Sequence, residues 1–527
     1  MRKHVPLIAA AAAVIVMAVQ PLAGAAGGVR TQSLRQGVTN AGIMQHLEKF
    51  QEIASANDDT RASGTPGYDA SAKYVKNRLT AAGYDVRVQE FDFIFFDETA
   101  DPILERVSPN PEVYQNVDDF LTMEYSGSGN VTAPLVPTND IIIPPGATAS
   151  TSNSGCEPGD FPVSTDGAIA LVQRGTCDFI VKAQNAEAAG AVGVIIFNEG
   201  QEGRQETLNG TLGSPVGIPV MGTSFAVGEE LYNLTKTSTV TMHMFTQVIT
   251  EERSTSNVLA DTPGGRPDRV VVVGAHLDSV PEGPGINDNG SGSATILEVA
   301  EELAELDVTP RNKVRFAFWG AEESGLIGSE HYVASLSQRQ LSKIFMNLNF
   351  DMVASPNYVR FVYDGNGSDT PVKGPSGSGQ IERVFTEYFS SQGLASEPTE
   401  FSGRSDYGPF IAEGIPAGGL FTGAEGIKTE EQEDVYGGVA GLAYDPCYHQ
   451  FCDDLIEPNS EPELEAAYGP SVLIGNVNMK ALREMSDATA HAVLTFAMTQ
   501  SSPSGTGRSG HTYDPEELEF KGSHAPR

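Results

Sequence analysis

Short apolar segments that end in histidine, aspartate or glutamate recur along this chain. The segments are VVVGAHLDSV with His276, GINDNGSGSA with Asp288, VRFAFWGAEESG with Glu322 and Glu323, and IFMNLNFDMV with Asp351. Such runs are typical of parallel strands, whose carboxyl ends meet at one edge of an open α/β sheet, where ligand sites lie. Imidazole and carboxylate groups are zinc-type ligands. The sequence therefore predicts an α/β fold with a metal site at the edge of its sheet.

His449, further along the chain, brings the candidate ligands to five. Two zinc ions need about five such residues when one carboxylate bridges them. Each residue alone has a simpler interpretation as a buried, hydrogen-bonded group, so the hypothesis depends on the set. Asp278, two residues after His276, is placed to hold the second ring nitrogen of that histidine.

Glu322 and Glu323 are adjacent, which allows a division of labour. One glutamate can bind metal while its neighbour acts as general base toward water. A solvated surface pair is the alternative interpretation, and the apolar RFAFWGA before the pair disfavours it.

The composition limits the partners of the chain. Its formal net charge is −36 and its pI is near 4.5. These values argue against nucleic acid or an anionic membrane surface, because both attract basic patches. The glycine-rich GINDNGSGS could be a phosphate-binding loop, but it lacks a Gly-Lys-Ser/Thr ending and its aspartate repels phosphate.

The amino terminus predicts export. Residues 1–25 have a basic start, an apolar stretch and a small-residue ending, which is the pattern of a cleavable signal peptide, so the mature protein would begin near Ala26. A membrane anchor over residues 7–19 is the alternative, but this stretch is short for a span of about 20 residues. We therefore expect a secreted, extracellular protein with no membrane partner.

Cysteine usage agrees with export. The four cysteines fall as two local pairs, Cys156 with Cys177 and Cys447 with Cys452. The second pair flanks Tyr448 and His449, so a disulfide there would close a tight loop around two candidate site residues. Metal ligation by cysteine is the alternative, and the CxxxxC spacing is loose for a zinc knuckle.

The spacing of these acids and histidines, followed by GRSDYGPF, AGGLFTGAEG and DPCYHQFCD, resembles the zinc aminopeptidases secreted by actinomycetes. It is similar, more distantly, to vacuolar aminopeptidase Y and the catalytic domain of glutamate carboxypeptidase. The resemblance implies a zinc exopeptidase fold, with a mixed, mostly parallel central sheet flanked by helices, and two Zn²⁺ per chain. It also implies a cis peptide bond between Asp288 and Asn289.

The resemblance also implies roles for individual residues. Asp288 would bridge the metals, with His276 and Asp351 completing one site and Glu323 and His449 the other. Glu322 would be the general base, and Tyr448 would donate a hydrogen bond to the developing oxyanion. Glu322 and Asp351 could bind the substrate ammonium group, Arg404 would help to place the substrate, and Met352 and Phe421 would line an apolar pocket. Ordinary core packing is the alternative for Met352 and Phe421.

We expect residues 26–116 and 247–500 to form the peptidase domain. Between them, residues 117–246 change to short strands and turns, and GAIALVQRGTCDFIVKAQNAEAAGAVGVIIFN resembles the protease-associated (PA) domain, a small β-rich, noncatalytic insert. Cys156 and Cys177 would then pair within this insert. Helices are expected over residues 43–54, 67–83, 294–306 and 479–499, and a strand over 84–93. Residues 501–527 are polar and predict a disordered tail.

Calcium is not predicted. Some secreted relatives bind it partly through acidic residues in the final helix, and this chain keeps Asp487 but has Arg483 where an acid is expected. Together, the sequence and the resemblance predict an exported, monomeric zinc aminopeptidase that acts on the amino termini of peptides or proteins. We expect it to have a broad, hydrophobic preference for the amino-terminal residue. A carboxypeptidase or aminoacyl-amide hydrolase on the same fold is an alternative. An inactive receptor-like relative, as transferrin receptor is, would have lost metal ligands that this chain retains.

Overall fold

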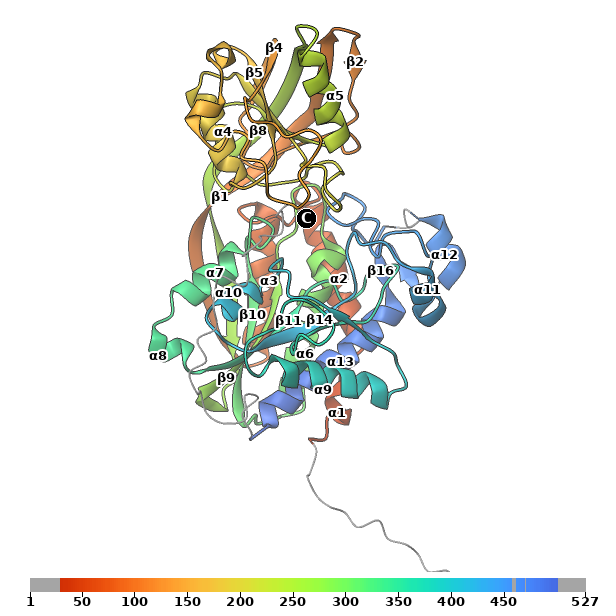
Figure 1. The fold of residues 1–527 in the computed structure, drawn as a ribbon. Helices are drawn as coiled ribbons and strands as arrows, with labels where there is room; N and C mark the ends of the chain where they lie inside the picture. The colour runs from red at the N-terminus through yellow and green to blue at the C-terminus, as the bar shows by residue number, and fades with distance from the viewer. Residues whose placement is uncertain (1–28, 457–460, 470, 501–527) are drawn as a thin grey trace, which may run out of the picture.

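In the computed structural model, which describes residues 29–456, 461–469 and 471–500, the chain forms a larger lobe and a smaller one above it (Figure 1). The predicted signal peptide and the predicted tail lie outside the described residues. Within the described part, no helix is long and apolar enough to cross a membrane.

A mixed sheet lies at the centre of the larger lobe. Its strands run in the order β13, β12, β14, β11, β9, β10, β8. The bounds are β8 Thr241–Asp261, β9 Arg266–His276, β10 Asn312–Trp319, β11 Ile344–Phe350, β12 Phe361–Tyr363, β13 Glu397–Thr399 and β14 Ala417–Phe421. β9, β10, β11 and β14 are parallel, β8 pairs antiparallel with β10, and β12 pairs antiparallel with β14 but parallel with β13. The predicted α/β class with a mostly parallel sheet is confirmed.

Alternate residues of the strands enter two different cores, one on each face of the sheet. On β9, Val271 and Val273 pack in the largest cluster, while Val270 and Val272 pack with Trp319 on the opposite face. Because side chains alternate along a strand, a run that is apolar at every position must be covered on both faces. The central strands are therefore buried, and their polar ends become the interior of a site.

Helices cover both faces of this sheet. The helices of the larger lobe are α1 Gln32–Gly37, α2 Asn40–Ser55, α3 Pro66–Ala81, α6 Gly292–Glu305, α7 Ile327–Ala334, α8 Gln338–Leu341, α9 Ser378–Ser391, α10 Gly408–Ala412, α11 Glu430–Tyr436, α12 Pro462–Tyr468 and α13 Met479–Met498. Local chemistry sets several of their starts, because Thr39, Thr65 and Asn478 accept backbone N–H groups of the first turns of α2, α3 and α13. The predicted helices at 43–54, 67–83, 294–306 and 479–499 are confirmed.

The smaller lobe has its own parallel strands and two helices. These elements are β3 Phe120–Thr122, β4 Gly129–Pro137, β5 Ile169–Gln173, β6 Gly193–Phe197, β7 Val220–Thr223, α4 Phe179–Ala188 and α5 Phe225–Thr235. β4, β5, β6 and β7 pair in parallel, and β3 closes the sheet antiparallel to β7. The Cys156–Cys177 disulfide lies in this lobe, with a Cα separation of 5.8 Å.

Two long antiparallel strands connect the lobes. β1, Asp85–Ser108, pairs with β8 from Asp85↔Asp261 to Ser108↔Thr241, and the short β2, Glu112–Val113, pairs with β1 in turn. Figure 1 shows this ribbon passing from the lower to the upper lobe. β8 pairs with β10 at its carboxyl end and with β4 at its amino end. One sheet path therefore runs through both lobes.

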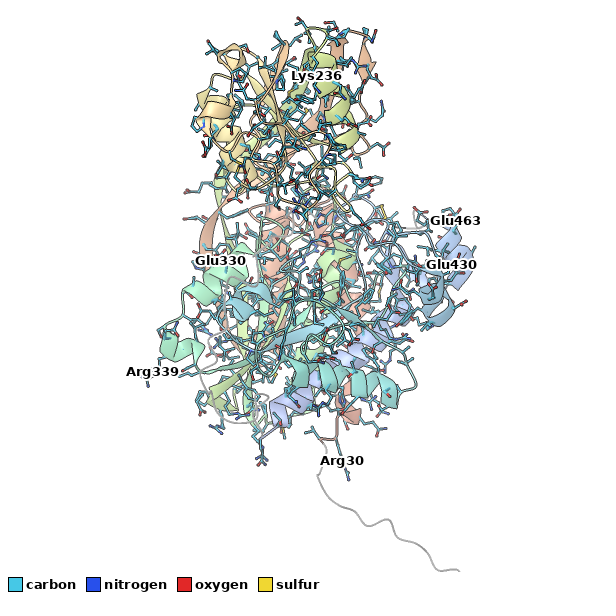
Figure 2. All side chains as sticks on the ribbon, viewed as in Figure 1. Arg30, Lys236, Glu330, Arg339, Glu430 and Glu463 are labelled. Atoms are coloured by element: carbon cyan, nitrogen blue, oxygen red, sulfur yellow. A yellow bond between two sulfur atoms is a disulfide. The ribbon has the colours of Figure 1, made fainter. Side chains whose placement is uncertain are left out.

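Charged side chains are spread over the outside of both lobes. Figure 2 labels Lys236 on the smaller lobe and Glu330, Arg339, Glu430 and Glu463 on the larger, and all five are exposed. In the final helix, Arg483 pairs with Asp487 at 3.0 Å and donates to the Val38 carbonyl at 2.8 Å. Arg483 therefore compensates the negative charge of Asp487 on this helix.

Candidate functional site

The candidate ligands lie at the carboxyl ends of three adjacent parallel strands and on two nearby loops. His276 is the last residue of β9, Asp351 follows the end of β11, and Glu323 follows β10 closely. Asp288 lies in the helical turn η3, Ile286–Ser291, that leads into α6. His449 comes from a loop after α11. The sheet thus brings together the five residues that the strand-end pattern and the later histidine suggested.

These side chains form two groups that share Asp288. His276 Nε2 lies 3.2 Å from Asp288 Oδ1 and 3.3 Å from Asp351 Oδ1. His449 Nε2 lies 3.3 Å from the other oxygen, Asp288 Oδ2, and 3.1 Å from Glu323 Oε2. Each oxygen of one carboxylate therefore faces a different imidazole.

The chemistry of this donor set fits two divalent cations. Ligands 2.0–2.2 Å from a tetrahedral zinc lie about 3.3–3.6 Å from one another, close to the separations in both groups. His276, Asp288 and Glu323 are all buried, and one imidazole nitrogen cannot donate to several carboxylates at once. Although burial opposes it, the Glu323 and Asp288 carboxylates raise the pKa of His449 to about 10. The carboxylates thus favour positive charge at this place. A bound metal ion would supply that charge in place of protons.

Glu322 lies beside the first group. Its Oε2 is 3.8 Å from His276 Nε2, and burial together with neighbouring carboxylates raises its pKa well above the usual value. Asp278 connects the histidine to the glutamate pair. His276 Nδ1 is 3.1 Å from the Asp278 carbonyl oxygen and 3.6 Å from its carboxylate, which accepts the Glu322 and Glu323 backbone N–H groups at 3.3 and 3.4 Å.

Two further aspartates, which the sequence interpretation missed, hold the loop of Asp288. Asp453 accepts the backbone N–H groups of Asn287 at 2.7 Å and Asp288 at 2.9 Å, and Asp445 accepts the Asn287 side-chain amide at 2.6 Å. Both are buried. They begin and end the quoted motif DPCYHQFCD, so this motif was the available signal. The predicted cis bond between Asp288 and Asn289 is confirmed.

Arg61 is a further positioning residue, and no motif indicated it. It is fully buried and donates to the carbonyl oxygens of Leu277 at 2.5 Å, Pro284 at 2.8 Å and Gly285 at 2.6 Å. Its guanidinium lies over the Phe50 ring at 4.9 Å, and burial lowers its pKa to about 10. The segment between His276 and Asp288 is therefore tied to the amino-terminal part of the chain.

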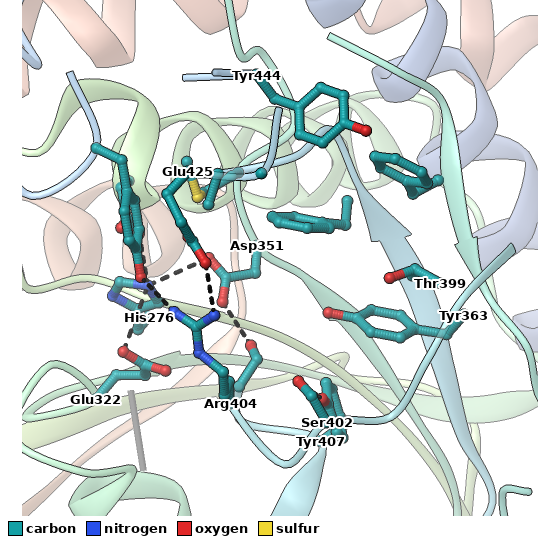
Figure 3. Close-up of a pocket in the computed structure, with 18 of the residues that line it drawn as sticks. His276, Glu322, Asp351, Tyr363, Thr399, Ser402, Arg404, Tyr407, Glu425 and Tyr444 are labelled. Atoms are coloured by element: carbon teal, nitrogen blue, oxygen red, sulfur yellow. Dashed lines mark hydrogen bonds and ion pairs between the residues drawn. The ribbon is translucent and has the colours of Figure 1, made fainter. Parts of the chain in front are cut away.

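A cavity of about 240 Å³ opens beside the two groups (Figure 3). One side carries the candidate ligands and Glu322. Tyr363 and Tyr444 lie on the other side, and Met352, Phe361 and Phe421 also line the cavity. Met352 and Phe421 therefore line the cavity together with aromatic side chains that the sequence interpretation did not name.

Arg404 lies between the two sides of the cavity. It donates to Glu425 Oε1 at 3.0 Å and to the Tyr448 hydroxyl oxygen at 3.2 Å (Figure 3). The Tyr448 ring stacks on that of His449, with centroids 3.8 Å apart. Since Arg404 is the donor, the hydroxyl hydrogen of Tyr448 remains available for another acceptor.

The Cys447–Cys452 disulfide closes a short ring around Tyr448 and His449, with a Cα separation of 5.3 Å. His449 has a φ of 56°, in the left-handed region that side chains other than glycine rarely adopt. The ring therefore helps to hold an unfavourable backbone conformation at a candidate ligand.

Replacing both Cys447 and Cys452 by serine should lower turnover more than thermal stability. A short ring restricts few conformations of the unfolded chain, but it can orient the two residues that it encloses. Turnover and melting temperature should be measured together, with a Cys156→Ser, Cys177→Ser variant as the matched control for loss of a disulfide. A large fall in melting temperature with unchanged turnover would contradict this assignment.

Two family descriptions match the chain, Peptidase family M28 over residues 257–467 and the PA domain over residues 131–231. An aminopeptidase from Pseudomonas aeruginosa is 50% identical over 422 residues, which cover 80% of this chain and 77% of that protein. A probable leucine aminopeptidase 2 from Aspergillus fumigatus is 43% identical over 487 residues, which cover 89% of this chain and 90% of that protein. The solved structure of a zinc aminopeptidase from Bacillus subtilis has a TM-score of 0.58 at 25% identity, covering 89% of this chain and 98% of that chain.

These matches extend over both lobes. The identity to the bacterial and fungal relatives is high over most of each chain, and the PA match lies within residues 117–246 and includes the segment that resembles that domain. The resemblance stated from the sequence is confirmed. The chain belongs to peptidase family M28 and is a peptide hydrolase that carries a PA domain.

Proposed function

We propose that the protein is an aminopeptidase with two zinc ions, which removes the amino-terminal residue of peptides and proteins. The convergence of two imidazole nitrogens and three carboxylates in two groups that share Asp288 carries this proposal. His276 and Asp351 would hold one ion, Glu323 and His449 the other, and Asp288 both. When bound, such ions lower the pKa of water and polarise the scissile carbonyl. The names of the bacterial relative and the solved neighbour support the proposal.

Glu322 is the proposed general base. It takes a proton from the attacking water and returns it to the departing amine. Its backbone N–H is held by Asp278, which also contacts the His276 ring, so the base and a ligand are positioned by one residue. Tyr448, whose oxygen accepts from Arg404, is oriented to donate its hydroxyl hydrogen to the carbonyl oxygen as negative charge develops there.

The substrate's amino terminus and first side chain would be bound on opposite sides of the cavity. Glu322 and Asp351 can accept hydrogen bonds from the ammonium group. Met352 and Phe421, with the aromatic residues beside them, favour a hydrophobic first side chain. Among the described residues that line the cavity, Arg404 is the only lysine or arginine, and it is paired with Glu425. A substrate carboxylate would have to break that pair, which disfavours a carboxypeptidase.

A comparison of free and amino-terminally blocked reporters tests this proposal. Leucyl p-nitroanilide should be hydrolysed, whereas its N-acetyl derivative should not, because acetylation removes the positive charge that the acidic side of the cavity attracts. Glycyl and lysyl reporters, measured as kcat/KM, give the preference for the first side chain. Equal hydrolysis of the free and acetylated compounds would exclude an aminopeptidase.

The proposed location is outside the cell. Both cysteine pairs are disulfides, which persist in oxidising compartments and are rare in the cytosol. We propose that the chain acts as a monomer after export.

The smaller lobe is proposed to be an accessory module. None of the candidate ligands, the base or Tyr448 comes from residues 117–246. Glu98 and Val248 are directly paired across the connecting ribbon, so this pair marks a place at which the lobe can be removed.

Deleting residues 99–247 and joining Glu98 to Val248 through an Asn-Gly turn should preserve hydrolysis of a small aminoacyl reporter. The turn suits a two-residue hairpin, and Ile94 and Phe96, which pack against the smaller lobe, should be changed to Thr. Activity on longer peptides should change, because the covering lobe is gone. Zinc content and circular dichroism confirm that the shortened protein is folded. If the folded, zinc-loaded variant failed on the small reporter, the smaller lobe would be part of the active site.

A further inference from the structure

A histidine and two glutamates meet between α2 and α6, away from the proposed active site. His46 lies on α2, and Glu298 and Glu301 lie three residues apart on one face of α6. His46 Nε2 is 3.4 Å from Glu298 Oε2 and 3.8 Å from Glu301 Oε2. One ligand atom from each of the three residues lies within 4.8 Å of the others. Glu298 is six residues after the start of α6 at Gly292, roughly 9 Å along the helix axis, so the cluster is separate from the loop of Asp288.

The Nε2 atom of His46 is buried without the hydrogen bond that burial normally requires, and the Glu298 carboxylate beside it is largely buried. The His46 and Glu298 side chains are 1% and 9% exposed. His46 Nδ1 is 2.8 Å from the Tyr74 hydroxyl, whereas its Nε2 makes no hydrogen bond. Within residues 29–456, 461–469 and 471–500, no group donates a hydrogen bond to Glu298. Burying a carboxylate in this way is costly unless a cation compensates it.

The surroundings hold Glu298 in this place and remain acidic. A Cβ at Gly42 would lie 1.8 Å from Glu298 Oε1, so the carboxylate fits only because α2 has a glycine there. Arg78 pairs with both oxygens of Glu301, Nε with Oε1 at 2.5 Å and Nη2 with Oε2, and compensates one of the two carboxylates. Glu302 and Glu305 follow on the same helix. The local charge is therefore negative, and within the described part of the chain no lysine or arginine pairs with Glu298.

We propose that His46, Glu298 and Glu301 form a further metal site, for a divalent cation of the zinc class. A nitrogen and two carboxylate oxygens are ligands that zinc accepts, and a hydrogen bond from Nδ1 to the Tyr74 oxygen would leave the Nε2 lone pair free to bind. The separations of 3.4 and 3.8 Å are longer than ordinary hydrogen bonds, and the shorter lies in the range expected between zinc ligands. Glu301, which is 17% exposed, provides the side open to water and to an entering ion.

The proposed site would join two helices that support the active site. α6 follows directly from η3, which carries Asp288, and Leu47 of α2 approaches Gly290 in the same turn. A cation bound between α2 and α6 would stabilise this part of the fold without touching the substrate. Its expected effect is therefore on stability rather than on turnover.

Metal counting on the full chain tests the proposal. Wild type, His46→Gln and Glu298→Gln should be dialysed to equilibrium against buffered free zinc and analysed by mass spectrometry for zinc per chain. Each variant should hold one zinc fewer than wild type and should keep the wild-type turnover. Glu302→Gln, on the same helix, is the matched control and should hold as many ions as wild type. Zinc added beyond saturation of the active site should raise the melting temperature of wild type and of the control only.

The test compares the zinc content per chain of each variant with that of the wild type. The result therefore does not depend on how many ions the active site holds. If both variants held as much zinc as wild type, His46, Glu298 and Glu301 would be held by contacts within the protein alone, and the proposal would be overturned. The proposal would also be overturned if Glu302→Gln held one zinc ion fewer than wild type. The loss would then result from removing any negative charge from α6, and not from removing a ligand. If His46→Gln failed to fold, Glu298→Gln would give the answer alone.

Discussion

Glu322→Gln should lower kcat by about 10²- to 10⁴-fold, the usual contribution of a general base. The amide keeps the size of the side chain in its buried position but cannot take a proton from water. Zinc content and the melting temperature should stay close to those of the wild type, because Glu322 is not among the five candidate ligands. KM for leucyl p-nitroanilide, measured with kcat, separates loss of the chemical step from loss of binding.

Glu400→Gln is the matched control for this variant. Glu400 lines the same cavity, but from the segment that follows β13, and should change turnover little. Near-normal turnover in Glu322→Gln would remove Glu322 from its proposed role. An equal loss in both variants would indicate that the cavity needs negative charge in general.

Removing the metals with a chelator should reduce hydrolysis to the uncatalysed background, and zinc should restore it. The two groups around Asp288 consist of nitrogen and oxygen donors, so zinc should be effective, whereas magnesium, which prefers oxygen ligands alone, should not be. Turnover should be measured on samples whose residual metal has been determined. Full turnover in a sample shown to contain no metal would contradict the proposal.

Ligand variants make the same prediction more specific. Asp288→Ala should lower the zinc content by two ions per chain, because each of its oxygens faces a different histidine, whereas His449→Ala should lower it by one. Equal losses in the two variants would mean that Asp288 does not bridge.

The strand-end residues could be predicted because local pattern and sheet geometry act together. An apolar run followed by His276 or Asp351 indicates a buried parallel strand, and parallel strands place their ends side by side. Helix limits were predicted to within a few residues where a capping side chain such as Thr65 begins the helix. These features depend on residues close together in the sequence.

Other features depend on partners that are distant in the sequence. The strand expected over residues 84–93 continues to Ser108 because β8 pairs with it along its whole length. Helix α5 was not predicted, although Ser224 caps it. Arg61 was not identified because its role comes from carbonyl groups more than 200 positions away, whereas Asp445 and Asp453 could have been inferred from their motif.

The smaller lobe is inserted in the chain between the two strands of the connecting ribbon. This insertion also sets the order in which the two lobes can fold during synthesis. The core of the larger lobe combines residues such as Leu47 and Val75 with Val273, Phe316 and, at the far end of the chain, Val493. The smaller lobe instead draws its core from a nearly continuous stretch between Leu104 and Met244. Because domains fold as units when their residues emerge from the ribosome, we expect the smaller lobe to be complete first. The amino-terminal helices of the larger lobe would keep their apolar faces exposed to solvent until α13 has been synthesised.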